Sequence, residues 1–259
     1  MGGRGATSSI GTMSGSASAI LQPQADTNAQ VDDTQVANAF SASYDQFMAM
    51  SDDEKADFID ANIKQGVPAH LAQNDFQKFI YNSGLNEKPQ LVNDATLDTM
   101  NGTELFRTVN NVYDGRNDIS YSADQIAKQV TAGRVTRVSD NGGSVYGRGI
   151  YFADDYHGSV GYGNTSGNIQ KTAVVRAKLN SNAKVINYYT ASQGASSEIA
   201  SGSKLGKTLR KCDSDSRASI YAMSKGYNVI TSGHGYYNVL NRNAITMSSD
   251  IKPKGSKWK

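Results

Sequence analysis

Two periodicities in the hydrophobic pattern divide the chain into a helical part and a strand-rich part. In the first part, Val36, Phe40, Tyr44 and Phe47 recur at intervals of three or four residues, which predicts the apolar face of an amphipathic helix. This helix opens a segment, residues 34–100, in which the helical period dominates. We therefore expect residues 34–100 to form a small lobe of packed helices.

Two further helices are predicted in this lobe from their end signals. Ser51 and Glu54 have the spacing of a capping box, and Gly66, followed by Val-Pro, marks the end of the second helix. A third helix is expected over residues 71–81, before an Asn-Ser-Gly sequence. His70, shortly after a proline at the start of that helix, is interpreted as structural.

After the helical lobe, short apolar runs alternate with turns rich in glycine and asparagine. Residues 104–109 form the first predicted strand, and a capping box of Ser122 and Gln125 opens a helix that is closed by Gly133. Alternating polar and apolar side chains in residues 171–179 predict a half-buried strand. The remaining predicted elements are strands at 185–186, 227–231 and 237–241, a helix at 215–224 and a turn at 232–235. This order of elements predicts an α+β domain.

Composition indicates a soluble protein with a flexible beginning. Residues 1–33 are small and polar, with almost no large apolar side chains, so we expect a flexible arm. Hydrophobic residues make up 38% of the 259 residues, and the mean hydropathy is negative. No apolar run is long enough to span a bilayer, and the N-terminus lacks the pattern of a secretory signal. A cytoplasmic location without a membrane partner is therefore expected.

Charge and cysteine content narrow the classes of function. The net charge of +2 is too small to indicate nucleic-acid binding by itself. Acidic residues gather at 26–60 and basic ones at 204–217, which we interpret as solvated surface, with an anionic partner at the basic end as the alternative. Cys212 is the only cysteine, which excludes an intrachain disulfide and a cysteine-based metal cluster. An ordinary thiol is expected there, and no metal site is predicted.

The clearest candidate chemistry lies in residues 146–163, which read YGRGIYFADDYHGSVGYG. The glycines let a backbone approach a ligand closely, the tyrosines offer two aromatic faces, and the serine offers a hydroxyl. Such a set suits a flat aromatic amide, held between two rings and bonded at its carboxamide. The predicted ligand-binding positions are Gly147, Gly149, Tyr151, Phe152, Ala153, Ser159 and Tyr162. Core aromatics beside a glycine turn are the alternative interpretation.

This segment resembles the NAD-binding core of poly(ADP-ribose) polymerases and related diphtheria-toxin-type transferases, whose pattern is Gly-Lys-Gly-Ile-Tyr-Phe-Ala-Asp, then Ser, then Tyr. The spacing agrees throughout. The resemblance implies that Tyr151 stands beside the nicotinamide ring, that Ser159 bonds its amide and that Tyr162 stacks on the opposite face. Gly158 stands where the polymerases often have lysine, so that side-chain contact is absent.

The resemblance extends over residues 103–247 and also gives the first strand a role. Arg107 stands where arginine-specific transferases and their toxin relatives hold the phosphates or ribose of NAD, and a guanidinium matches the geometry of phosphate oxygens. Thr108 replaces the usual glycine, and its backbone is expected to bond the carboxamide. The polymerases have histidine in place of the arginine, so this chain combines two kinds of motif.

The family's catalytic glutamate has no counterpart at the expected place, where Tyr236 stands nearest. A carboxylate in a dry pocket stabilises the positive charge that develops on the ribose as nicotinamide leaves. Its absence argues against chain elongation more than against a single transfer. The acids considered as substitutes are Glu198, Asp154 and Asp155. His157 and His234 lie in glycine-rich loops and are expected to be exposed.

The resemblance implies an NAD-dependent mono-ADP-ribosyltransferase that modifies a macromolecule and releases nicotinamide. The implied fold has two packed, mostly antiparallel sheets around an NAD cleft, here in residues 101–251, between the helical lobe and a basic tail at 252–259. Arg107, Tyr151 and Ser159 are then the catalytic residues, NAD is a substrate, and no metal is required. The alternatives are an inactive NAD-binding or structural virion protein, and an NAD-dependent RNA 2′-phosphotransferase.

The sequence MGGRGATSS resembles, over a short stretch, the tails of bacteriophage head-associated proteins that carry enzymatic domains. This implies a phage or prophage origin and adds packaging in the virion to the expected locations. The helical lobe would then serve delivery, packaging or docking. A protein acceptor is favoured over a nucleic acid, and its identity stays open because the turn at 232–235 is short.

Overall fold

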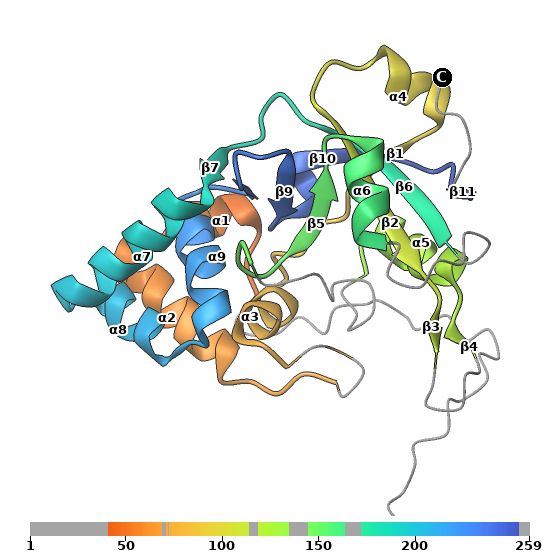
Figure 1. Ribbon diagram of the computed structural model, residues 1–259. Coiled ribbons are helices and arrows are strands. Elements are labelled where there is room, and N and C mark those ends of the chain that lie inside the picture. Colours follow the sequence, from red (N-terminus) through yellow and green to blue (C-terminus); the bar gives the residue numbers. More distant parts are fainter. Residues whose placement is uncertain are drawn as a thin grey trace, which may run out of the picture. The chain divides into compact units, whose positions relative to one another are not determined.

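The computed structural model describes residues 41–68, 71, 73–113, 119–134, 145–163 and 172–253 (Figure 1). The predicted arm at 1–33, Val36 and Phe40 of the first predicted helix, His70 and most of the basic tail lie outside these residues. The described residues belong to one compact unit. Within these ranges, no helix combines the length and the apolar character that a bilayer span needs.

Three short helices open the described part of the chain. α1 (Tyr44–Ala49) and α2 (Asp52–Ile63) each follow a serine whose capping box is complete, and the box predicted at Ser51 is confirmed. α3 (Asp75–Ser83) begins later than predicted because its capping residue is Asn74, and it ends at a glycine with left-handed backbone. Each of these boundaries is set by a polar side chain or a glycine at the helix end.

Three helices from the second half of the chain pack with this group: α7 (Tyr188–Ser201), α8 (Lys204–Lys211) and α9 (Ser214–Ser224). Figure 1 shows α1, α2, α7, α8 and α9 gathered on one side of the sheet. α9 confirms the helix predicted at 215–224. The large buried side chains that these helices share include Phe47, Ile59, Phe79, Leu209, Ile220 and Met223. The predicted helical lobe therefore shares its core with α7–α9.

A nine-stranded sheet forms the second layer of the described residues, in the order β1-β10-β6-β2-β5-β9-β8-β7, with β11 also paired to β6. The strands are β1 (Gln90–Val92), β2 (Glu104–Asn110), β5 (Ile150–Ala153), β6 (Thr172–Leu179), β7 (Val185–Asn187), β8 (Val229–Thr231), β9 (Tyr236–Val239), β10 (Ile245–Ser248) and β11 (Lys252–Pro253). The β1–β10 and β7–β8 pairings are parallel, and the other described pairings in this sheet are antiparallel. β3 (Val112–Tyr113) and β4 (Ile119–Tyr121) pair separately.

The expected arrangement of two packed sheets is wrong for the described residues, although the α+β class is confirmed. The halves β1-β10-β6-β2 and β5-β9-β8-β7 form one mixed sheet, because β2 pairs with β5. That joint is the single pair Phe106–Ala153, whereas β2 pairs with β6 along its whole length. Side chains, rather than a backbone ladder, connect β2 to β5 beyond this pair. The joint is where the predicted site residues lie.

Three more helices cover the sheet: α4 (Asp94–Thr99), α5 (Ala123–Thr131) and α6 (Tyr156–Gly163). α5 packs on β2 and β6, and α6 packs on β2 and β5. The predicted capping box at Ser122 is present at the start of α5. α6 therefore places the second half of residues 146–163, which we call the glycine-framed segment, directly over the joint.

β6 is buried on both faces, so the prediction of a half-buried strand is wrong. Residues 172–177 are all buried. α5 packs against this strand, and the opposite face carries Arg176, which is only 4% exposed. The polar and apolar residues of this strand alternate because one of its two buried faces carries the charged side chain of Arg176. Neither face of the strand is open to solvent.

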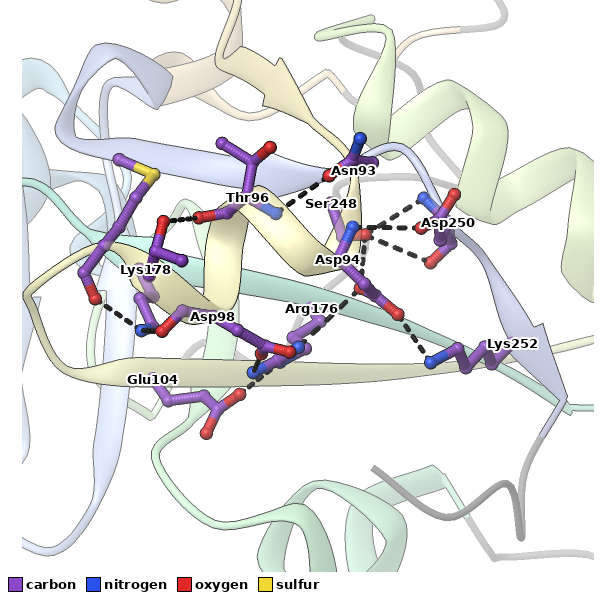
Figure 2. Close-up of polar contacts among 12 residues, drawn as sticks. Asn93, Asp94, Thr96, Asp98, Glu104, Arg176, Lys178, Ser248, Asp250 and Lys252 are labelled. Atoms are coloured by element: carbon purple, nitrogen blue, oxygen red, sulfur yellow. Dashed lines mark hydrogen bonds and ion pairs between the residues drawn. The ribbon is translucent and has the colours of Figure 1, made fainter. Parts of the chain in front are cut away.

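The positive charge of Arg176 is balanced by acidic side chains from neighbouring elements (Figure 2). Its guanidinium contacts Asp98 of α4 at 2.5 Å and bonds Glu104 of β2, and it lies 3.7 Å from Asp94. Asp94 in turn pairs with Lys252 of β11 at 2.5 Å. A buried cation is stable only when such partners are present. The network ties α4, β2, β6 and β11 together.

Candidate functional site

Arg107 and Thr108 lie in the middle of β2, next to the joint with β5. They stand opposite Val175 and Val174 of β6, so the β6 ladder fixes their backbone. The Arg107 guanidinium reaches across the joint, and its Nη1 donates a hydrogen bond to the backbone oxygen of Tyr151 at 2.9 Å. Arg107 is thus in direct contact with the glycine-framed segment, as the predicted site requires.

Tyr151 lies in β5 and is held through its hydroxyl. The hydroxyl donates to the backbone oxygen of Gly147 at 2.6 Å and accepts from the backbone N–H of Tyr146 at 2.9 Å. Burial, the largest influence, raises the pKa of Tyr151 well above its ordinary value. The phenol therefore stays neutral near pH 7. Its ring can pack against a ligand, but its hydroxyl is already hydrogen-bonded to residues 146 and 147 and is not a base.

Ser159 lies in α6, above β2, and is only 5% exposed. Its hydroxyl is hydrogen-bonded to the hydroxyl of Thr108 at 2.9 Å. The rings of Phe106 and Tyr156 meet edge to face, with centroids 6.0 Å apart, and fasten the start of α6 to β2. Ser159 and Thr108, 51 positions apart in sequence, are therefore in contact.

The four residues Arg107, Thr108, Tyr151 and Ser159 form what we call the β2–β5–α6 junction. Hydrogen bonds join Arg107 to Tyr151 and Thr108 to Ser159. Three elements separated in sequence thus bring a guanidinium against the backbone of Tyr151 and place two hydroxyls in contact. These groups can hold an anionic group, pack against an aromatic ring and bond an amide.

The two glycines are required by packing against the protein itself. Gly147 has a φ of 82°, and a Cβ there would lie 2.6 Å from the hydroxyl of Ser219. A Cβ on Gly149 would lie 2.1 Å from Oδ1 of Asn238. We expected these glycines to admit a ligand, whereas the space beside their α-carbons is filled by Ser219 and Asn238.

Phe152 and Ala153, also predicted to bind the ligand, point into protein. Phe152 is 2% exposed and belongs to the core between the sheet and α5, and Ala153 is 4% exposed. Their backbone extends the ladder with β9, where Ala153 stands opposite Tyr236. Tyr162 is part of the α6 backbone, and its side chain lies outside the described residues. The second ring of the predicted sandwich stays a prediction.

Of the acids considered as substitutes for the missing glutamate, Asp154 lies nearest to Tyr236. Its N–H donates to the backbone oxygen of Gly235 at 2.9 Å, and its carboxylate fills the space beside that glycine. Asp155 accepts the N–H of Gly158 at 2.6 Å and so caps the first turn of α6. Asp154 is thus the acid beside the strand that begins at Tyr236.

Glu198 and Cys212 have structural environments among the helices. Glu198 accepts a hydrogen bond from Ser203 at 2.6 Å and pairs with Lys225 at 3.1 Å. These bonds, that of Ser203 first, lower its pKa. Cys212 is 2% exposed, and burial raises the pKa of its thiol to about 12. The Glu198 carboxylate is therefore bound to Ser203 and Lys225 within the helical group. The buried, protonated thiol of Cys212 agrees with the expectation of an ordinary, unreactive cysteine.

The described histidines lie outside the β2–β5–α6 junction. His157 and His234 are exposed, as predicted. His157 lies beside the ring of Tyr156 at the start of α6. In the residues that the structure describes, no group of three or more His, Cys, Asp or Glu side chains is arranged to hold a metal ion.

Sequence reasoning missed three residues that shape the site: Asn238, Ser219 and Asp215. Asn238 of β9 stands directly opposite Tyr151 and is 1% exposed. Ser219 and Asp215 of α9 bond the backbone oxygen and the guanidinium of Arg148, at 2.7 and 2.9 Å. The only signal in the sequence is a polar Asn238 in an otherwise apolar strand position, which indicates a specific buried hydrogen-bond partner.

Comparisons with protein-family models, with curated proteins and with solved structures find no match for this chain. A proposal about its function therefore rests on the sequence motif and on the geometry of the residues in it. The β2–β5–α6 junction is the part of the described structure where residues predicted from sequence to share a site are in direct contact.

Proposed function

We propose that the β2–β5–α6 junction binds NAD and that the protein transfers ADP-ribose from it to a macromolecule. The observation that carries the proposal is the pair of contacts Arg107–Tyr151 and Thr108–Ser159. The resemblance in sequence places these four residues around one NAD molecule, although they come from three separate elements. The two contacts bring the strand of Arg107 and the motif of Tyr151 and Ser159 side by side, which a shared site requires.

The proposed chemistry needs few groups from the protein. The bond between the ribose C1′ and the nicotinamide nitrogen breaks, nicotinamide leaves with the electron pair, and a nucleophile of the acceptor bonds C1′ and releases its proton. Arg107 would hold the phosphates or ribose, since a guanidinium pairs well with them. Ser159 and the Thr108 backbone would bond the carboxamide. Asp154, next to the strand of Tyr236, is the acid we propose for stabilising the cationic sugar.

One observation favours a second candidate, an NAD-binding protein without transferase activity. The Ser159 hydroxyl already has a partner in Thr108, a residue that stands in place of the family's glycine. No acidic residue stands at Tyr236 itself. Losing one preorganised charge-stabilising group costs about 3 kcal/mol of transition-state stabilisation, or more than a hundredfold in rate. A slow or inactive enzyme would still bind NAD.

Incubation with NAD labelled in its adenylate, together with a bacterial lysate, separates these candidates. A transferase labels macromolecules and releases nicotinamide; an inactive binder retains NAD and does neither. We expect labelling that Arg107→Lys reduces by about 10-fold or more, because lysine lacks the planar fork. Arg210→Lys, on the exposed face of α8, is the matched control and should label normally. Equal labelling by both variants would refute the assignment of Arg107.

A further inference from the structure

A buried amide on β9, that of Asn238, is hydrogen-bonded to the loop that also binds the Tyr151 hydroxyl. Asn238 stands opposite Tyr151 in the β5–β9 ladder, so both side chains project from the same face of the sheet. Nδ2 of Asn238 donates to the backbone oxygens of Tyr146 and Arg148, at 2.9 and 3.3 Å. The Tyr151 hydroxyl binds the N–H of Tyr146 and the oxygen of Gly147. Two neighbouring side chains therefore bind four backbone groups of one loop, residues 146–149.

The same loop is fixed from its other side by α9. Ser219 donates to the backbone oxygen of Arg148 at 2.7 Å, and Asp215 pairs with the Arg148 guanidinium at 2.9 Å. Gly149 packs so closely on Asn238 that a Cβ would collide with Oδ1. The loop is thus held between β9 and α9, with Asn238 as its contact on the side of Tyr151.

We propose that Asn238 is a positioning residue: it holds residues 146–149 in the shape that fixes the Tyr151 ring in the proposed NAD site. Asn238 itself does not touch the reacting atoms. Its effect passes through the loop, whose Tyr146 and Gly147 backbone groups bind the Tyr151 hydroxyl. The expected effect on NAD binding rests on the proposed function. The effect of Asn238 on the conformation of residues 146–149 does not, because it can be measured without NAD.

The chemistry at this position calls for an amide. The two groups to be bound are carbonyl oxygens, which need a donor, and the asparagine amide nitrogen supplies two N–H groups in one plane. An aspartate of the same shape would present an acceptor to both oxygens, and an apolar side chain would leave the partly buried oxygen of Tyr146 without this bond. A side chain that only filled space in the core would not need a hydrogen-bond donor. The experiment therefore removes the donor while keeping the shape of the side chain.

Asn238→Asp tests the proposal, with Asn228→Asp as the matched control. Asn228 is also buried, at 6% exposure, and precedes β8, but its Oδ1 accepts from the N–H of Lys184, a bond that aspartate retains. Two quantities are measured in each variant: hydrogen exchange of the Tyr146 amide, and the dissociation constant for NAD. Exchange of the amides in the β5–β9 ladder reports whether the sheet is intact.

We expect Asn238→Asp to speed exchange of the Tyr146 amide at least about 10-fold while the ladder amides stay protected. NAD binding should weaken by about 10- to 100-fold, since misplacing a site residue by about 1 Å has effects of that size. Asn228→Asp should change neither quantity by more than about twofold, because it lies away from residues 146–149. If Asn238→Asp does not fold, Asn238→Ala, which removes the donor without adding charge, carries the same test.

Two results would overturn the inference. Unchanged exchange of the Tyr146 amide means that Asn238 does not hold the loop. Faster exchange with undiminished NAD binding means that the loop does not position the site. If the wild-type protein binds no NAD, the proposed function fails and the consequence for NAD fails with it, whereas the exchange measurement still decides whether Asn238 holds residues 146–149.

Discussion

Gly149 lies at the point where the loop of residues 146–149 meets β9, and its backbone leaves no space for a side chain. A Cβ there would lie 2.1 Å from Oδ1 of Asn238 and 2.9 Å from the backbone oxygen of Val239. The backbone oxygen belongs to the β5–β9 ladder and cannot turn away as a flexible side chain can. The restriction is therefore one of packing as well as of backbone conformation.

We predict that Gly149→Ala lowers the free energy of unfolding by about 2–3 kcal/mol, because an extra atom in a closely packed interior displaces its neighbours. Gly66→Ala is the control, since nothing lies within 4 Å of a Cβ there. Urea titration of both variants makes the comparison. A loss at Gly149 no larger than that at Gly66 would show that the loop is looser than described.

At the scale of elements, Asp213 joins two helices. Its carboxylate caps α9 by accepting the N–H of Ser216 at 3.0 Å, and it also accepts the N–H of Asp75, at the start of α3, at 2.9 Å. Asp75 returns a bond to the N–H of Asp213 at 2.8 Å. Burial, the largest single influence, acts to raise the pKa of Asp213, but these bonds together lower it below its ordinary value.

A depressed pKa in the folded state means that ionised Asp213 stabilises the fold above the unfolded-state pKa, and that this contribution is lost as the pH falls through the folded pKa. We predict that Asp213→Asn costs about 1 kcal/mol at pH 7, a modest value because the site is only half-buried, and close to nothing at pH 2. Denaturant titrations of both proteins at several pH values test this. A difference that does not change with pH would contradict it.

Elements that begin with a capping box were predicted well, whereas α7 and α8 were missed although Asn187 and Ser203 cap their starts. The capping boxes at Ser51 and Ser122 and the strand at β2 follow from local residues. α7 has a serine- and alanine-rich sequence with little apolar periodicity, so only its packing against α8 and α9 makes its burial apparent. The burial of β6 depends on Arg176 finding acidic partners from other elements, which no local pattern contains.

The site divides in the same way. Tyr151 and Ser159 belong to one continuous motif, and Arg107 and Thr108 belong to a strand at the expected distance before it. These four residues could therefore be identified from the sequence. Asn238 and Ser219 come from β9 and α9, and they meet the motif only through the strand register and the packing of α9. Long-range pairing of this kind cannot be read from one sequence without homologues.

At the scale of the whole molecule, the Arg176 network joins α4 and the last described strand, β11, to the middle of the sheet. Asp94 and Asp98 of α4 and Lys252 of β11 meet Glu104 and Arg176 of β2 and β6 (Figure 2). β2 is also the strand that carries Arg107 and Thr108. The network therefore stabilises the strand on which the proposed site is built.

We predict that Arg176→Met destabilises the protein by about 2–4 kcal/mol, because it leaves partly buried carboxylates without their cation. The loss should change less with salt than that of a fully exposed pair, since the guanidinium is buried. Lys204→Met, which breaks an exposed pair with Asp57, is the control and should leave stability almost unchanged. Thermal unfolding of the two variants at low and high salt tests both statements, and equal effects would contradict them.

The central claim is that NAD binds at the β2–β5–α6 junction, and titration of the isotope-labelled protein with NAD, followed by the backbone amide signals, tests it most directly. We predict saturable shifts at a concentration below about 1 mM. The largest should fall at Arg107, Thr108, Tyr151 and Ser159, with smaller ones in residues 146–149. Absence of saturable shifts, or shifts confined to residues away from this junction, would contradict the account.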